Sequence, residues 1–233
     1  MTRRPSAPPP LGSSALAAFR DALTADELRT LLAGAGEDRA SSVLGAVIGD
    51  AVDLSILAHR TALLTWLRSW GCRHLRRSDT SRSSAALLRW WSRWSDALPA
   101  PTTSLVDLGA DDLAAIGPAY AALASLRAAA RASSNGEVAV AFGDTAAAKA
   151  LFALRPRALP PWDEPIRLAF GRASHDGDLY VRYLVETADA LRGGAVRFGL
   201  AVDDLPAALG RPSITPARLI DEYLWRRITR QAR

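Results

Sequence analysis

The fold is decided by residues 143–167, which read GDTAAAKALFALRPRALPPWDEPIR. The apolar spacing from Asp144 to Leu154 predicts a helix. The prolines that follow disfavour helical backbone and predict a stiff extended link. A second helix is expected to begin just after Trp162 and Asp163, because aspartate is a preferred N-cap residue. The segment therefore predicts a helix, a rigid link and an acidic helix start.

Helical periodicity dominates the rest of the chain as well, without a convincing series of alternating strands. We therefore predict an all-α fold. Further helices are expected from the Thr24 capping box to about Gly34, from Asp53 to Trp70, from Ser83 or Ser84 to Trp94, from Asp111 to about Ala132, from Asp176 to Leu191 and from Thr215 to Arg230. Residues 138–142 are apolar over too short a length to decide between a strand and the first turn of a helix.

A turn cluster, Ser133-Ser134-Asn135-Gly136, is the best internal boundary in the sequence. We expect an N-terminal helical lobe at residues 13–133, a C-terminal helical lobe at residues 134–233, and a cleft between them. Residues 1–12 are rich in proline and are expected to form a disordered tail, since no apolar stretch follows Arg3 and Arg4 as a signal-peptide core would.

Composition excludes several classes of protein. No window approaches the roughly 18 to 20 uninterrupted apolar residues of a membrane span. The single cysteine, Cys72, excludes an internal disulfide and a four-cysteine zinc or iron-sulfur site, and the three histidines lack ligand spacing. No phosphate-binding loop, serine elbow or dinucleotide fingerprint is present. We expect a monomer in the reducing cytoplasm, with no metal and no cofactor.

The central segment resembles the helix-hairpin-helix superfamily of DNA glycosylases over about thirty residues. Members carry a glycine hairpin and a Thr-Ala helix, followed about twenty residues later by a catalytic aspartate at a helix start, and Asp163 falls on this position. Of the two hairpin glycines only Gly143 is present, and the lysine of bifunctional members falls on Asp144, which cannot form a Schiff base. The stretch Trp66–Arg73 is also similar to uncharacterised bacterial relatives. The resemblance implies a monofunctional glycosylase.

The chemistry of base removal explains why an aspartate is suited to that position. Breaking an N-glycosidic bond builds positive charge on the deoxyribose, and a nearby carboxylate stabilises this charge and orients or deprotonates the attacking water. The dipoles of a helix N-terminus keep such a carboxylate ionised. The alternative is that Asp163 only caps the helix ahead of Glu164 and Pro165.

Two further candidates precede Asp163 in the central segment. Lys149 is the only lysine of the chain, and we expect it either to bind a phosphate or act as an amine nucleophile, or to be a solvated residue on a polar helix face. Trp162 has a flat face suited to stacking on an extruded base. Its alternative role is packing in the core.

Arginines are concentrated between Arg68 and Trp94, where tryptophans and hydroxyl residues separate them. Such a surface suits a DNA backbone, because arginine binds phosphate bidentately and releases counterions. The candidate DNA-binding residues are Arg73, Arg76, Arg77, Arg82 and, in the central segment, Arg167. The alternative is a solvated loop in front of a tryptophan-rich core helix.

Together these observations predict DNA as the partner and release of a damaged or modified base as the reaction, in repair or in defence against viral DNA. Two alternatives stay open. One is a helical DNA-binding module without catalysis, and the other is a helical interaction protein without a nucleic-acid role. DNA binding at low salt separates the last from the other two, and the formation of abasic sites separates the first two.

Overall fold

The computed structural model of the protein describes residues 10–33, 52–134, 136–171 and 173–231. Within these ranges the chain is mostly helical, as predicted, with one two-stranded antiparallel sheet. In chain order the elements are α1 (Leu11–Asp21), α2 (Ala25–Leu32), α4 (Leu57–Ser69), α5 (Thr80–Trp94), α6 (Ala110–Ala124), β1 (Arg127–Ser133), β2 (Gly136–Ala141), α7 (Asp144–Leu154), α8 (Glu164–Phe170), α9 (Gly177–Phe198), α10 (Leu205–Ala208) and α11 (Pro216–Gln231).

The central segment folds as its sequence predicts. α7 spans Asp144–Leu154, and α8 begins at Glu164, directly after Asp163. The turn before α7 needs a glycine, because Gly143 has a φ of 84°, in the region that other residues rarely adopt. The two helices and the link between them are therefore encoded locally.

Caps define the ends of other predicted helices. At α2 the Glu27 amide donates to the Thr24 hydroxyl and the Thr24 amide donates to the Glu27 carboxylate, which is the expected capping box. α9 runs beyond its predicted end at Leu191 and stops at Phe198, where Gly199 adopts the left-handed conformation with a φ of 65°.

Some predicted boundaries are wrong. α4 begins after Asp53, because the Asp53 carboxylate accepts a hydrogen bond from the Ser55 amide at 2.8 Å and holds a turn there. α5 begins at Thr80, so Ser83 and Ser84 are buried within the helix and do not cap it. Residues 1–9 of the expected tail and the expected helix end at Gly34 lie outside the described residues, whereas Leu11 and Gly12 belong to α1.

The largest difference from the prediction lies at residues 127–133, which form strand β1 and not the end of a helix. β1 pairs with β2, so that Arg131 lies opposite Val138 and Ser133 opposite Gly136. Alanine-rich sequence favours a helix, but the pairing satisfies the backbone, and the buried Ser83 hydroxyl donates to the Ala128 carbonyl at 2.6 Å. The expected boundary therefore falls within this hairpin, where Ser133 and Gly136 are paired; Asn135 lies outside the described residues.

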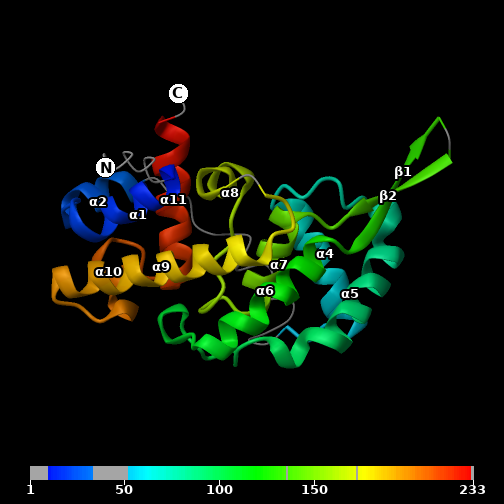
Figure 1. Cartoon of the computed structure of the whole chain (residues 1–233), viewed down its shortest axis with the longest axis horizontal. Coiled ribbons are helices and arrows are strands. Elements are labelled where there is room, and N and C mark those ends of the chain that lie inside the picture. Colours follow the sequence, from blue (N-terminus) through cyan, green and yellow to red (C-terminus); the bar gives the residue numbers. More distant parts are fainter. Residues whose placement is uncertain (1–9, 34–51, 135, 172, 232–233) are drawn as a thin grey trace, which may run out of the picture.

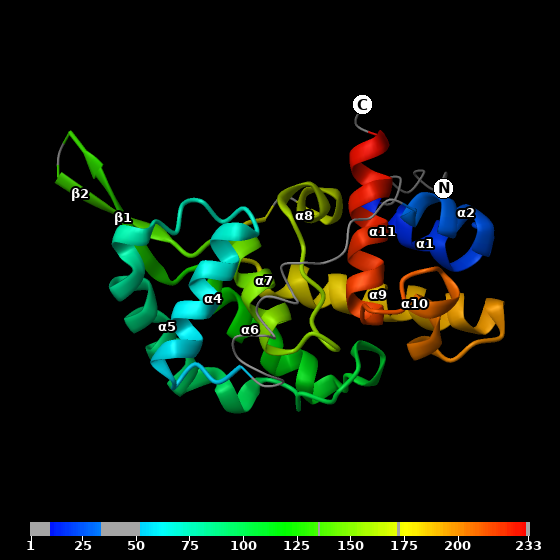
Figure 2. The same ribbon diagram turned by 180° about the vertical axis from the view of Figure 1, so that it is seen from behind.

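The helices group by contact and not by chain order. α1 packs against α8, α9 and α11, and α2 packs against α11, so the N-terminal helices lie beside the C-terminal ones. α4, α5, α6, α7 and the hairpin form the other group, and α9 joins the two through α6 (Figures 1 and 2). The division into lobes at residue 134 stays a prediction, but residues 11–32 pack with the C-terminal group.

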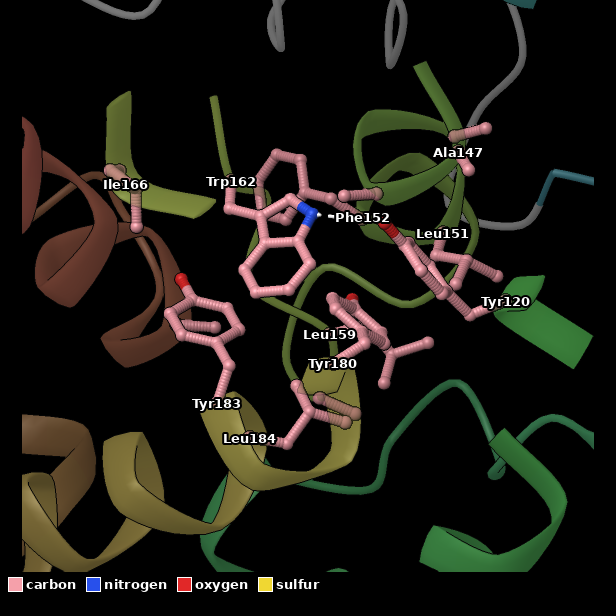
Figure 3. Close-up of a cluster of buried hydrophobic side chains, with 14 of the residues drawn as sticks. Tyr120, Ala147, Leu151, Phe152, Leu159, Trp162, Ile166, Tyr180, Tyr183 and Leu184 are labelled. Carbon is pink, nitrogen blue, oxygen red and sulfur yellow. Dashed lines mark hydrogen bonds between the residues drawn. The ribbon is translucent and has the colours of Figure 1, made fainter. Parts of the chain in front are cut away.

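A buried aromatic cluster fixes the proline link between α7 and α8 (Figure 3). Trp162 packs edge-on against Tyr180 and tilted against Tyr183, with ring centroids 5.2 and 4.9 Å apart. The Tyr180 and Tyr183 hydroxyls donate to the Pro160 and Pro161 carbonyls at 3.3 and 3.0 Å. Buried hydroxyls seek such partners, and here the partners belong to the link. The start of α8 is thereby held in place.

Candidate active site

Two adjoining hollows open beside the start of α8, with volumes of about 230 and about 540 Å³. They share a border of two aromatic and two charged residues, Trp70, Lys149, Asp163 and Trp225. We call the smaller hollow the inner pocket and the larger one the outer pocket. The inner pocket is completed by Pro161, Arg218, Asp221 and Glu222. Elements from both groups of helices therefore contribute to a single concave site.

Asp163 occupies the N-cap position of α8, yet its side chain makes no capping hydrogen bond. Its Oδ1 instead lies 2.6 Å from Nζ of Lys149, and the Asp163 side chain stays 35% exposed. Capping alone therefore does not explain this carboxylate. Lys149 fixes the Asp163 carboxylate, and the rest of this carboxylate is accessible from the two pockets.

Lys149 is buried, with only 8% of its surface exposed, so the alternative of a solvated lysine is wrong. Its ammonium group donates to the Trp70 carbonyl at 2.7 Å and lies 5.3 Å from the centre of the Trp70 ring. A buried ammonium needs such partners, because an isolated charge in the interior is strongly unfavourable. The carbonyl, the ring and Asp163 together supply them.

The prediction that Trp162 stacks on a base is not supported by the structure. The side chain is 1% exposed, and its ring nitrogen donates to the Tyr120 hydroxyl at 3.2 Å. The core-packing alternative holds. The exposed aromatic at the site is Trp225, which is 42% exposed and borders both pockets.

α11 contributes most of the site residues that sequence reasoning missed. Arg218, Asp221, Glu222 and Trp225 follow one another at helical spacing and so lie on one face of α11. That spacing was a readable signal, but a polar stripe on a helix usually faces solvent. Here the stripe faces the inner pocket.

Asp221 is a second acidic group of the inner pocket, and it is almost fully buried. Arg218 forms an ion pair with it and lies 5.0 Å from the centre of the Trp70 ring. Burial raises the pKa of the Asp221 carboxyl from 3.8 to about 7, although the Arg218 guanidinium acts in the opposite direction. Glu222 accepts from Arg211 at 2.9 Å. The inner pocket is thus lined by three acidic residues, Asp163, Asp221 and Glu222, each with a different basic partner.

Groups at the Gly143 turn already make hydrogen bonds within the protein. The Gly143 amide donates to the Ala124 carbonyl at 2.9 Å. The Asp144 carboxylate accepts from the Tyr120 hydroxyl at 2.9 Å and from the His175 amide at 2.7 Å. These bonds give Asp144 a structural role at the position where the resemblance places a lysine in bifunctional members.

Three predicted DNA-binding arginines lie on the exposed loop between α4 and α5, beside the outer pocket, namely Arg73, Arg76 and Arg77. No ion pair involves them within the part of the chain that the structure describes. Arg68, near the end of α4, stabilises the loop by donating to the Leu75 carbonyl at 2.6 Å. The loop therefore presents three exposed arginines without an ion-pair partner among the described residues, against a single acidic residue of the loop, Asp79.

The other two predicted arginines differ from these. Arg82 is exposed but pairs with Glu137 of β2 at 3.1 Å. Arg167 is buried, donates to the Ala173 carbonyl at 3.0 Å, and lies 3.9 Å from the Asp144 carboxylate. Arg167 borders the outer pocket, yet its contacts are mainly structural.

Neither a metal site nor a reactive thiol is found in the described ranges. No group of three potential metal-binding side chains occurs there. Cys72 is buried beside the outer pocket, and burial raises the pKa of its thiol to about 11, so it is a poor nucleophile. Among the described helices, none has the length and apolar character needed to cross a membrane.

Comparisons with known proteins add no relative. No protein-family model matches the chain, and neither a curated protein nor a solved structure matches it. Functional inference for this chain therefore depends on the chemistry of the site.

Proposed function

We propose that this protein is a DNA glycosylase that hydrolyses the bond between a damaged or modified base and its deoxyribose. The observation that carries the proposal is the state of Asp163, a partly exposed carboxylate fixed by Lys149 at the edge of a pocket. The loop that carries Arg73, Arg76 and Arg77 borders the outer pocket, which Asp163 also lines. Positive charge around a recessed carboxylate is what a phosphate backbone and a developing sugar cation require.

In this proposal the target nucleotide leaves the duplex and places its base in the inner pocket, where Trp225 offers a stacking face. The sugar then lies next to Asp163. As the glycosidic bond breaks, the electron pair leaves with the base and Asp163 stabilises the positive charge on the sugar. Water adds to the sugar carbon and loses a proton to the carboxylate, which passes it to the departing base, so the products are the protonated free base and an abasic site.

The direct test is to incubate the protein with duplexes that each carry one modified base, and then to cleave abasic sites with alkali. The proposal expects alkali-dependent strand breaks at one class of modified base. If the duplexes bind but no abasic site forms on any of them, the non-catalytic DNA-binding module is the better description. If no duplex binds at low salt, DNA is not the partner.

A second candidate activity is strand cleavage after base release, and the position of Lys149 favours it. Its Nζ lies 2.6 Å from the candidate catalytic carboxylate, so a sugar bound next to Asp163 would also lie next to this amine. After proton transfer to Asp163, the amine would add to the C1′ aldehyde of the abasic sugar and lose water to form a Schiff base, from which elimination of the 3′ phosphate breaks the strand. Borohydride reduction would trap this adduct, and since Lys149 is the only lysine, peptide mapping would locate it without ambiguity.

A further inference from the structure

The β1–β2 hairpin extends away from the helices in both views of the molecule (Figures 1 and 2). Its two strands pair from Arg127 opposite Ala141 to Ser133 opposite Gly136. Toward the tip, residues 136–139 of β2 are exposed, including Val138 at 47%. The outer part of the hairpin therefore has no protein surface covering it in the described structure.

The composition of the hairpin makes it narrow and basic. Six of its thirteen strand residues are alanine and one is glycine, so little side-chain bulk surrounds the backbone ribbon. Arg127 and Arg131 are exposed, and neither forms an ion pair with any residue that the structure describes. The acidic Glu137 is already paired with Arg82 of α5. The hairpin thus carries two uncompensated positive charges.

The base of the hairpin is fixed to the site described above. The loop between α4 and α5 that carries Arg73, Arg76 and Arg77, called the arginine loop below, also contains His74. Nε2 of His74 lies 2.8 Å from the Phe142 carbonyl, within hydrogen-bond distance, and the Phe142 amide donates to the Leu126 carbonyl at 2.7 Å. The chain then passes through Gly143, which borders the outer pocket. The direction of the hairpin is therefore set relative to the pocket and the arginine loop.

We propose that the β1–β2 hairpin is an arm that enters a groove of duplex DNA next to the nucleotide held in the pocket. This inference rests on the proposed function and adds a second contact surface to it. A two-stranded ribbon fits the major groove of B-DNA, and small side chains such as alanine allow its backbone to approach the DNA closely. Arg127 and Arg131 then contact phosphates or base edges on either side of the groove.

The test compares the double variant Arg127→Ala/Arg131→Ala with a control that removes the same charge elsewhere. Arg20→Ala/Arg192→Ala is suitable, because α1 and the end of α9 lie at the opposite end of the molecule (Figure 1). The probes are one duplex oligonucleotide and its isolated strand, with affinity measured against salt concentration.

We expect the hairpin variant to lose about tenfold in duplex affinity and to lower the salt slope by about one to two, while the control variant binds as the wild type does. Affinity for the single strand should change little, because it offers no groove. Equal loss on both probes, or no loss on the duplex, overturns the groove-binding arm. If the wild type itself binds neither probe, the proposed function fails instead.

Discussion

Nζ of Lys149 lies 2.6 Å from Oδ1 of Asp163, and this contact joins the middle of α7 to the first residue before α8. The lysine is buried, whereas the carboxylate is about one-third exposed. Both residues line the two pockets, and the carboxylate is the more exposed member of the pair. A buried cation in contact with a partly exposed carboxylate fixes the orientation of that carboxylate, which is what a group that stabilises positive charge needs.

Asp163→Asn should abolish base release, with a loss on the order of 100-fold or more, because the amide cannot stabilise a cationic sugar or accept a proton from water. Duplex affinity should stay similar or rise, since a negative charge near the phosphates is removed. Single-turnover release of base and equilibrium binding measure the two effects.

The matched control for this variant is Glu164→Gln, which removes the same charge from the next residue, whose side chain is 72% exposed. It should retain nearly full activity. Wild-type rates in Asp163→Asn would show that the carboxylate is not catalytic.

Lys149→Gln should lower both stability and the rate of base release. The Trp70 carbonyl loses its charged donor and Asp163 loses its partner, so we expect a loss of about 1 to 3 kcal/mol in the free energy of unfolding. Urea unfolding measures this loss. If Lys149 also acts as a nucleophile, borohydride trapping disappears in the variant while some base release remains. Unchanged stability would contradict the buried ion pair.

Trp225→Leu tests the aromatic face at the mouth of the site. Stacking of a base on an aromatic side chain contributes about 1 to 3 kcal/mol, so binding of a duplex with a modified base should weaken about tenfold or more. Trp225→Phe keeps an aromatic ring and should recover most of the affinity. Equal binding by the leucine and phenylalanine variants would exclude stacking at this position.

The helices beside the site can be predicted from local sequence, whereas the set of residues that line the site cannot. The link prolines and the acidic residue before α8 were sufficient to place Asp163 at a helix start. The partner of Asp163 was not readable, because Lys149 lies on a helix whose two faces are both buried, and periodicity predicts a solvated lysine only when one face is exposed.

The remaining errors also arise from tertiary contacts. Trp162 and Trp225 have the same side chain, and only the packing of Tyr180 and Tyr183 around the first decides which of them is buried. Likewise, the alanine-rich stretch at residues 127–133 becomes a strand because β2 pairs with it. Local propensity contains no information on either partner.

Asp221→Asn should change how stability depends on pH. Because burial raises the pKa of Asp221 to about 7, the folded protein keeps its proton between about pH 4 and pH 7, where the unfolded chain releases it. The stability contributed by this group is therefore complete below pH 4 and lost as the pH rises to 7. The wild type should be more stable relative to the variant at pH 5 than at pH 8. Parallel urea-unfolding profiles would contradict this assignment.

Arg76→Ser/Arg77→Ser should weaken duplex binding without changing which base is released. Both side chains are exposed on the loop beside the outer pocket, so each is expected to neutralise one phosphate. Removing both should reduce the slope of log affinity against log salt by about two, and the loss should be largest at low salt. The same substitutions at Arg89 and Arg93, which are also exposed but lie toward the end of α5, separate local contact from net charge. An equal loss in both pairs would mean that the protein binds DNA through its overall charge, and a loss in neither would remove the arginine loop from the interface.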